Sequence, residues 1–194
     1  MASGRVCTGY SLPYVAKYVN TSGTISYSNG MKLARGVDVN ISPSASSSTK
    51  FYVDNTSGES AAGIFTGGTV TLTVDGLKLN AEKLIMGLGT ADSDGFTHYN
   101  DSTQPPYVGI GFVARYMEDG VTSYQAYILC KTVFDPVGTS AKTQGETIEF
   151  QTQSLTAQIL RSDDSVHTWK LIGEEQTTEA LAEADIKGYF GITP

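Results

Sequence analysis

The clearest pattern in the chain is an alternation of apolar and polar residues with a period of two, which is typical of half-buried β-strands. The most regular example is "GTVTLTVDG" at residues 68–76. We expect its two faces to differ sharply, one packed in a core and the other exposed to solvent or to a partner. The predicted core residues are Val70, Leu72 and Val74, and the opposite face carries Thr69, Thr71 and Thr73.

A second alternating stretch is "GETIEFQTQSLTAQIL" at residues 145–160. Its first half predicts a strand with two apolar residues in the core and polar residues on the other face. The parity then changes near Gln153–Ser154, because Leu155 and Ile159 are apolar at odd positions, which predicts a bulge or bend. The predicted core residues are Ile148 and Phe150, and the polar face holds Thr147, Glu149 and Gln151.

Further strand-like segments make the chain mainly β. Two long strands separated by "DG" at 119–120 predict a β-hairpin, and "SNG" at 28–30 predicts a tight turn. "NTSG" is expected to join the first two strands, and "FTHY" at 96–99 suggests a short strand. The predicted strands are 14–19, 24–28, 37–41, 107–118, 122–134 and 168–174.

Two segments change to helical periodicity. In "LNAEKLIMGLG", Asn80 is the expected cap, Gly87 or Gly89 is the expected end, and one apolar face should pack on the sheet. That face comprises Leu84, Ile85 and Leu88. Residues 177–190 predict a C-terminal amphipathic helix capped by Thr178, with Leu181, Ala184 and Ile186 as candidate packing residues.

Residues 42–63 are small and polar and predict a long excursion from the core. Loops of this length inside a compact domain are usually functional or mobile, and both interpretations stay open. The residues singled out as candidates for contact with another subunit are Ser42, Pro43, Phe51, Tyr52, Asp54 and Asn55.

The charge distribution argues against a protein that binds nucleic acid tightly. The net charge is −7, and the 13 basic residues are dispersed. Residues 1–90 carry a balance of +2 and residues 91–194 a balance of −9. This asymmetry reflects either an acidic C-terminal helix with acidic loops, or a head-to-tail contact between copies.

Targeting and redox signals are weak. Cys7 and Cys130 form neither a disulfide framework nor a zinc motif, so reduced thiols are expected. The N-terminus lacks the apolar run of a signal peptide, and no segment has the length of a membrane span. We expect a protein made and kept in a cytoplasm, or released by lysis.

The sequence offers little catalytic chemistry. His98 and His167 lie in polar segments, where histidines are usually solvated, and no nucleophile-elbow, zinc or phosphate-loop motif is present. "DSDG" at 92–95 resembles the start of a calcium loop but lacks the closing Glu, which favours a plain turn. We therefore expect no enzyme activity, cofactor or metal.

Several stretches together resemble the major tail proteins (tail tube proteins) of long-tailed, non-contractile phages of Gram-positive bacteria. They occur in the family's order and cover most of the chain, although none is a catalytic signature. They are "PYVAKY", "ISYSNGMKLARGVDVNIS", "FYVDN", "FTGGTVTLTVDGL", "PPYVGIGFV" and "AKTQGETIEFQTQSLTAQILRSD".

The resemblance implies a single domain over 1–194, with packed β-sheets forming a barrel or sandwich, one short packed helix, a long extended loop and a C-terminal helix. It implies self-assembly into stacked, hexameric rings, which form the tail tube of a virion. Assembly would take place in the host cytoplasm. The implied partners are other copies, the tape-measure protein, tail-tip and tail-terminator proteins, and DNA in transit, without a membrane.

The polar strand faces would then line the tube or contact a neighbouring subunit. A polar or weakly acidic wall lets DNA slide, because a basic wall would bind its phosphates. The alternatives are the tube of a contractile tail or related injection machine, and a secreted β-sandwich adhesin or carbohydrate-binding module.

Overall fold

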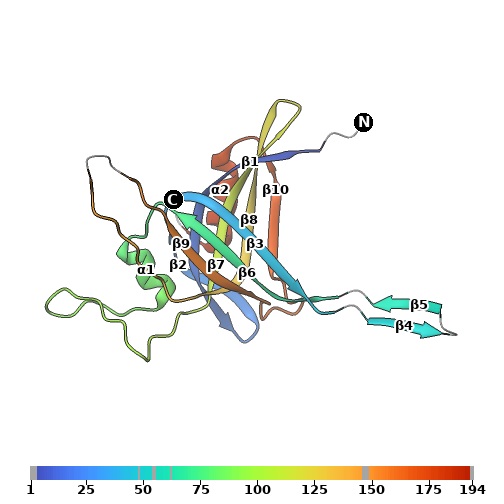
Figure 1. Ribbon diagram of the computed structural model, residues 1–194, viewed down its shortest axis with the longest axis horizontal. Coiled ribbons are helices and arrows are strands. Elements are labelled where there is room, and N and C mark those ends of the chain that lie inside the picture. Colours follow the sequence, from blue (N-terminus) through green and yellow to red (C-terminus); the bar gives the residue numbers. More distant parts are fainter. Residues whose placement is uncertain (1–3, 48, 54–55, 62, 146–148, 193–194) are drawn as a thin grey trace.

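The computed structural model describes residues 4–47, 49–53, 56–61, 63–145 and 149–192. They are mainly β, as expected, with two helices (Figure 1). The strands are β1 (Val6–Thr21), β2 (Thr24–Lys32), β3 (Gly36–Ala45), β4 (Thr49–Val53), β5 (Thr56–Ala61), β6 (Phe65–Val74), β7 (Val108–Glu118), β8 (Val121–Phe134), β9 (Gln153–Leu160) and β10 (Lys170–Gln176), and the helices are α1 (Leu79–Met86) and α2 (Glu179–Phe190).

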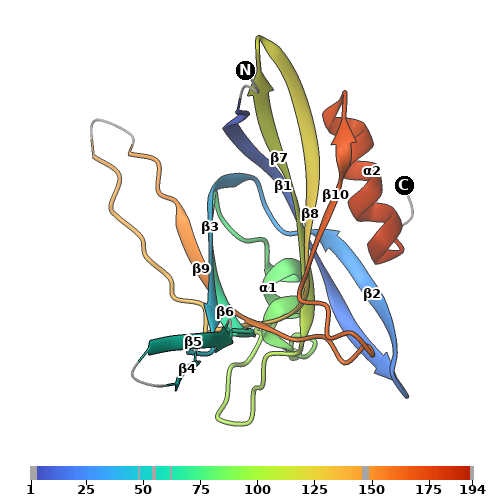
Figure 2. The same cartoon turned by 90° about the vertical axis from the view of Figure 1, so that its right-hand side faces the viewer.

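One large antiparallel sheet organises the chain, in the order β2-β1-β7-β8-β9-β6-β3. The tenth strand, β10, pairs with β8 beside β9 and so creates a fork in the sheet. The sheet bends so that β3, β6 and β9 lie on the opposite side of α1 from α2 (Figure 2). Its pairing order ends at β2 and β3, so the described strands do not close into a barrel.

Each face of this sheet carries its own apolar core. The larger core lies inside the bend and includes Val15, Leu72, Ile110 and Leu129, together with Ile85 of α1. A smaller core lies under α2. The alternation in β6 is confirmed, because Val70, Leu72 and Val74 are all fully buried.

Helix α1 ends where expected, at Gly87, whose left-handed φ of 68° suits glycine. Its cap position is Lys78 rather than the predicted Asn80, and no side chain caps it. The predicted apolar face is confirmed: Ile85 is buried, and Leu84 and Leu88 pack against the larger core.

Helix α2 is capped by Thr178, as predicted, whose hydroxyl accepts the Leu181 N–H at 3.4 Å. The packing face was predicted only in part, since Ile186 is buried but Leu181 and Ala184 are exposed. The buried stripe is Ala182, Ile186 and Phe190. Their spacing of four residues places them on one side of the helix.

Two glycines of β7 allow α2 to approach the sheet. A Cβ at Gly109 would lie 2.7 Å from Phe190 Cε1, and one at Gly111 would lie 2.6 Å from Ile186 Cγ2. A side chain at either position would therefore displace the helix, as is common for glycine within a strand.

The predicted turns gave mixed results. The "DG" hairpin is confirmed, with Asp119 and Gly120 at φ of 47° and 81° between β7 and β8. Ser22 and Gly23 join β1 to β2 within the predicted "NTSG". The "SNG" prediction is wrong, because Asn29 lies within β2 despite a φ of 53°. Residues 96–99 form no strand.

The strand predicted around residues 145–151 is wrong over its described part. Residues 149–152 have no regular structure, and β9 starts only at Gln153, which pairs with Val74. The chain turns away from the sheet after Val74 toward α1. Residues 149–152, which precede β9, therefore have no part of β6 to pair with. Phe150 is consequently 92% exposed rather than in the core, and Ile148 lies outside the described residues.

The fork in the sheet is fixed by a partly buried ion pair. Residues 124–129 of β8 pair with β10 and residues 131–134 pair with β9. Lys131 stands at this change of partner, and its Nζ donates to both carboxylate oxygens of Asp163 at 2.9 and 2.8 Å. The buried Tyr18 of β1 completes the cluster, since its hydroxyl donates to Asp163 and accepts the Asp163 N–H.

We expect Lys131→Met to lower the free energy of unfolding by about 1–3 kcal/mol at pH 7, between the values for exposed and buried pairs. The Lys131 ammonium holds the pKa of Asp163 below its usual range. A lowered carboxyl pKa contributes stability at neutral pH that is lost as the pH falls through the folded pKa, below about 4. The difference between variant and wild type should therefore shrink in acid.

Urea unfolding at pH 7, 5 and 3 measures this effect. Lys142→Met is the control, because Lys142 and Glu149 form an exposed pair at 3.1 Å. It should cost less than about 1 kcal/mol. A loss for Lys131→Met that stays constant down to pH 3 would contradict the role of the ion pair.

Candidate functional site

The strands β3, β6 and β9 form a three-stranded wing with one apolar and one polar face. Over residues 69–74 of β6 and 154–159 of β9 the buried residues alternate with half-buried or exposed polar ones, and on β3 Val39 and Ile41 pack against the larger core. Nine polar side chains occupy three successive rows of paired positions on the opposite face, and the half-buried Leu160 follows them on β9. The nine are Asp38, Asn40 and Ser42 of β3, Thr69, Thr71 and Thr73 of β6, and Ser154, Thr156 and Gln158 of β9. We call these nine residues the polar face.

The register aligns the polar face in three rows across the wing. Asn40 lies opposite Thr71, and Thr71 lies opposite Thr156, which makes the central row. The other rows are Ser42, Thr69 and Gln158, and Asp38, Thr73 and Ser154. Adjacent strands lie about 4.8 Å apart, so the rows form a continuous polar surface.

The charge of the polar face is small and negative. Asp38 is its only ionisable residue, and none of the nine is basic, although the chain has 13 basic residues. At the edge near β8, the Gln158 side chain donates to Asp135 at 3.3 Å, which adds a second carboxylate beside the face. Such a surface hydrogen-bonds water but offers no cation to a phosphate.

An open strand edge borders the polar face. Within the described sheet β3 pairs only with β6, so its other edge is unpaired. Such edges attract further strands unless they are blunted by proline or bulges. Pro43 and the two irregularities at Gly36/Asp38 and Ser44/Ala45 interrupt this edge without covering it.

The predicted excursion at 42–63 is a β-hairpin rather than a loop. Ser42 and Pro43 belong to β3, Phe51 and Tyr52 belong to β4, and β4 pairs with β5 as a separate two-stranded sheet. Asp54 and Asn55 lie outside the described residues. Figure 1 shows this hairpin, which we call the arm, projecting from the ends of β3 and β6.

The base of the arm is tied to the body of the protein. The Ser46 N–H donates to the Ile64 carbonyl at 2.8 Å, and the Ile64 N–H donates to the Ser46 hydroxyl at 3.0 Å. The Phe65 ring stacks on Trp169, with centroids 4.3 Å apart and planes 7° from parallel. These contacts fix where the arm leaves the sheet.

The structure separates the two sets of predicted polar residues. Thr69, Thr71 and Thr73 lie together on the polar face, whereas Glu149 and Gln151 precede β9 and are not part of it. Glu149 pairs with Lys142 instead. Thr147 lies outside the described residues. Sequence reasoning named Ser42 only as a candidate contact of the excursion and missed the other five residues contributed by β3 and β9, which only the strand pairing identifies.

The other candidate chemistry forms local turns. Asp92 accepts N–H groups of Asp94 and Phe96 at 3.0 and 2.8 Å, and its second oxygen lies 2.6 Å from His98 Nε2. His167 Nδ1 lies 3.1 Å from the Ser162 carbonyl oxygen. Among the described residues, no group of three or more His, Cys, Asp or Glu could hold a metal ion.

Comparisons add no family to this description. The sequence matches no protein-family model and no curated protein sequence. In the described part of the chain, neither helix has both the length and the apolar character needed to cross a membrane.

The assignment of the two faces of β6 can be tested with neighbouring residues. Leu72→Ala should lower the free energy of unfolding by about 2–5 kcal/mol, because it removes a fully buried side chain. Thr71→Ala, one position away on the polar face, should cost at most about 1 kcal/mol. Urea denaturation measures both, and equal losses would show that Thr71 also packs in a core.

Proposed function

We propose that this protein is the tube-forming subunit of a long, non-contractile phage tail, which assembles into stacked rings around a channel for DNA. The observation that carries the proposal is the polar face, nine paired positions without a lysine or arginine, beside an open strand edge. This combination adds to the sequence resemblance, and it suits a wall along which a polyanion must move.

Assembly into a ring would remove the unpaired strand edge that an isolated subunit exposes. An exposed edge strand tends to pair with another chain, and closing strands from several copies into a ring removes such edges. With the wing on the inner side, the polar face would line the water-filled channel. The arm would project beyond the subunit, where it can contact another copy.

The charge of the polar face fits the proposed cargo. Duplex DNA carries about one negative charge per 1.7 Å, and each phosphate neutralised by Lys or Arg strengthens binding through counterion release. A wall with Asp38 as its only charge would repel DNA weakly and let it pass. The tape-measure protein would occupy the channel before DNA, and tail-tip and terminator proteins would complete the virion tail.

Negative-stain electron microscopy of the purified protein tests the proposal directly. We expect rings or hollow tubes at high protein concentration, and sedimentation velocity should show the matching large species. A population of monomers at every concentration, in the presence of tail-tip proteins as initiators, would overturn it. Sugar binding by such monomers would favour the adhesin alternative instead.

Adding positive charge to the polar face should make tubes retain DNA. We expect Asn40→Lys/Thr156→Lys tubes assembled with duplex DNA to co-sediment several-fold more DNA than wild-type tubes, with a steep loss as salt rises. Thr90→Lys/Ser93→Lys adds the same charge at exposed positions outside the wing and serves as the control. Equal retention by the two variants would place the polar face outside the channel.

A further inference from the structure

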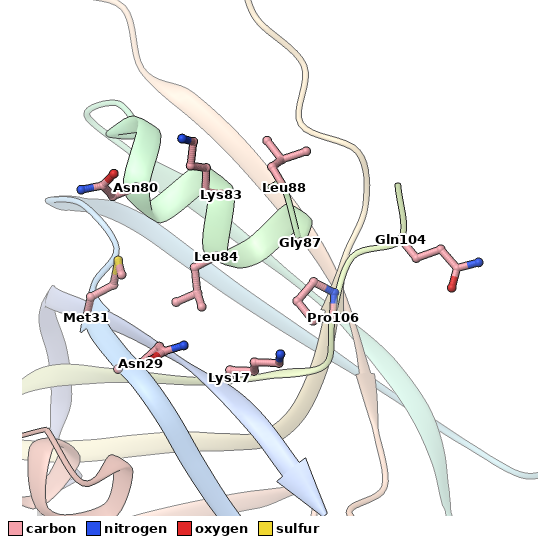
Figure 3. Close-up of a pocket in the computed structure, with 11 residues that line it drawn as sticks. Lys17, Asn29, Met31, Asn80, Lys83, Leu84, Gly87, Leu88, Gln104 and Pro106 are labelled. Atoms are coloured by element: carbon pink, nitrogen blue, oxygen red, sulfur yellow. The ribbon is translucent and has the colours of Figure 1, made fainter. Parts of the chain in front are cut away.

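A groove on the body of the protein is not used by the polar face. It lies between α1, β1, β2 and residues 104–106, and it has a volume of about 750 Å³ (Figure 3). Its apolar lining includes Met31, Leu84, Leu88 and Pro106. The groove therefore offers apolar surface as well as polar groups to a partner.

Two lysines border this groove from opposite sides. Lys17 comes from β1 and Lys83 from α1, and neither forms an ion pair with any residue that the structure describes (Figure 3). A second hollow, of about 430 Å³, is lined by Lys32, Arg35 and Lys78 and also by Asp75, which pairs with Arg35. The lining of the groove itself has two lysines and no carboxylate, in a protein whose net charge is −7, so it fits an acidic partner.

The same chain carries a segment with the complementary character. Near the end of β10, Ile172 is 49% exposed and is followed by the exposed Glu174 and Glu175. Among the residues that the structure describes, the one ion pair of the Glu175 carboxylate is a long one to Arg5, at 3.9 Å. One exposed apolar side chain beside two carboxylates matches apolar groove walls bordered by two lysines.

The groove and this segment lie in different parts of the subunit. The pairing of Gln176 with Tyr124 places the end of β10 toward the β7–β8 turn, whereas α1 lies toward the other end of those strands (Figure 2). Two different surfaces that complement each other make a head-to-tail contact, which repeats from copy to copy. Opposite charges also select the register of such a contact.

From these observations we infer that the groove binds the acidic end of β10, residues 172–175, of a second copy of this chain. The inference rests on the proposed function, because it names one of the contacts by which subunits would assemble. It also gives a structural origin to the difference in charge between the two halves of the sequence.

Charge reversal tests this contact. Lys17→Glu/Lys83→Glu makes the groove acidic, and Glu174→Lys/Glu175→Lys makes the end of β10 basic. Each variant alone should need at least about tenfold more protein to assemble than wild type, because like charges then meet at every contact. An equimolar mixture of the two variants should assemble near the wild-type concentration, since alternating copies restore opposite charges.

Light scattering and negative-stain microscopy measure assembly. Lys142→Glu/Arg161→Glu changes the same charge at exposed positions outside the groove and should assemble as wild type does. The neutral variants Lys17→Gln/Lys83→Gln should show a smaller loss in the same direction.

The outcomes separate this inference from the proposed function. Wild-type tubes together with groove variants that assemble normally, or with a mixture that does not recover, would overturn the inference and leave the function standing. A wild-type protein that never assembles would overturn the proposed function itself. Recovery in the mixture also shows that both variants are folded.

Discussion

The fork at β8 is the constraint on which the rest of the structure depends. One strand pairs with β10 over residues 124–129 and with β9 over residues 131–134. The connection between β9 and β10 must therefore cross the point where Lys131 stands, and the Lys131–Asp163 pair anchors it there. Because Tyr18 joins the same cluster, β1 is tied to the fork as well. The wing can then bend away from α2 while both faces of the central strands remain covered.

The features that could be predicted from sequence are those set by neighbouring residues. The alternation in β6, the "DG" turn and the Thr178 cap each depend on a few consecutive residues, and all three were predicted. Phe150 was misplaced because an alternating pattern describes a strand only where a partner exists, and β6 ends at Val74. For α2, the buried stripe includes Ile186 and Phe190, which lie against Gly109 and Gly111, two residues far away in the sequence.

The polar face likewise combines residues that a local sequence pattern identifies with residues that only strand pairing brings together. The three threonines are visible in the sequence because they alternate with Val70, Leu72 and Val74. Their neighbours Asn40 and Thr156 are about 30 and 85 residues away from Thr71 along the chain, so their alignment depends on non-local pairing. Composition alone gives no reason to group these residues. The registers of β3 and β9 against β6 turn separate polar positions into one surface.

The polar face and the open edge of β3 together favour the proposed assembly more than either feature does alone. A polar strand face alone is ordinary, because many antiparallel sheets expose one side to water. An edge strand alone is a hazard that proteins usually cover or interrupt. Here Pro43 and two irregularities interrupt the edge, yet ten residues remain unpaired on that side and lead directly into the arm. A ring of the proposed kind would use the edge, the face and the arm together.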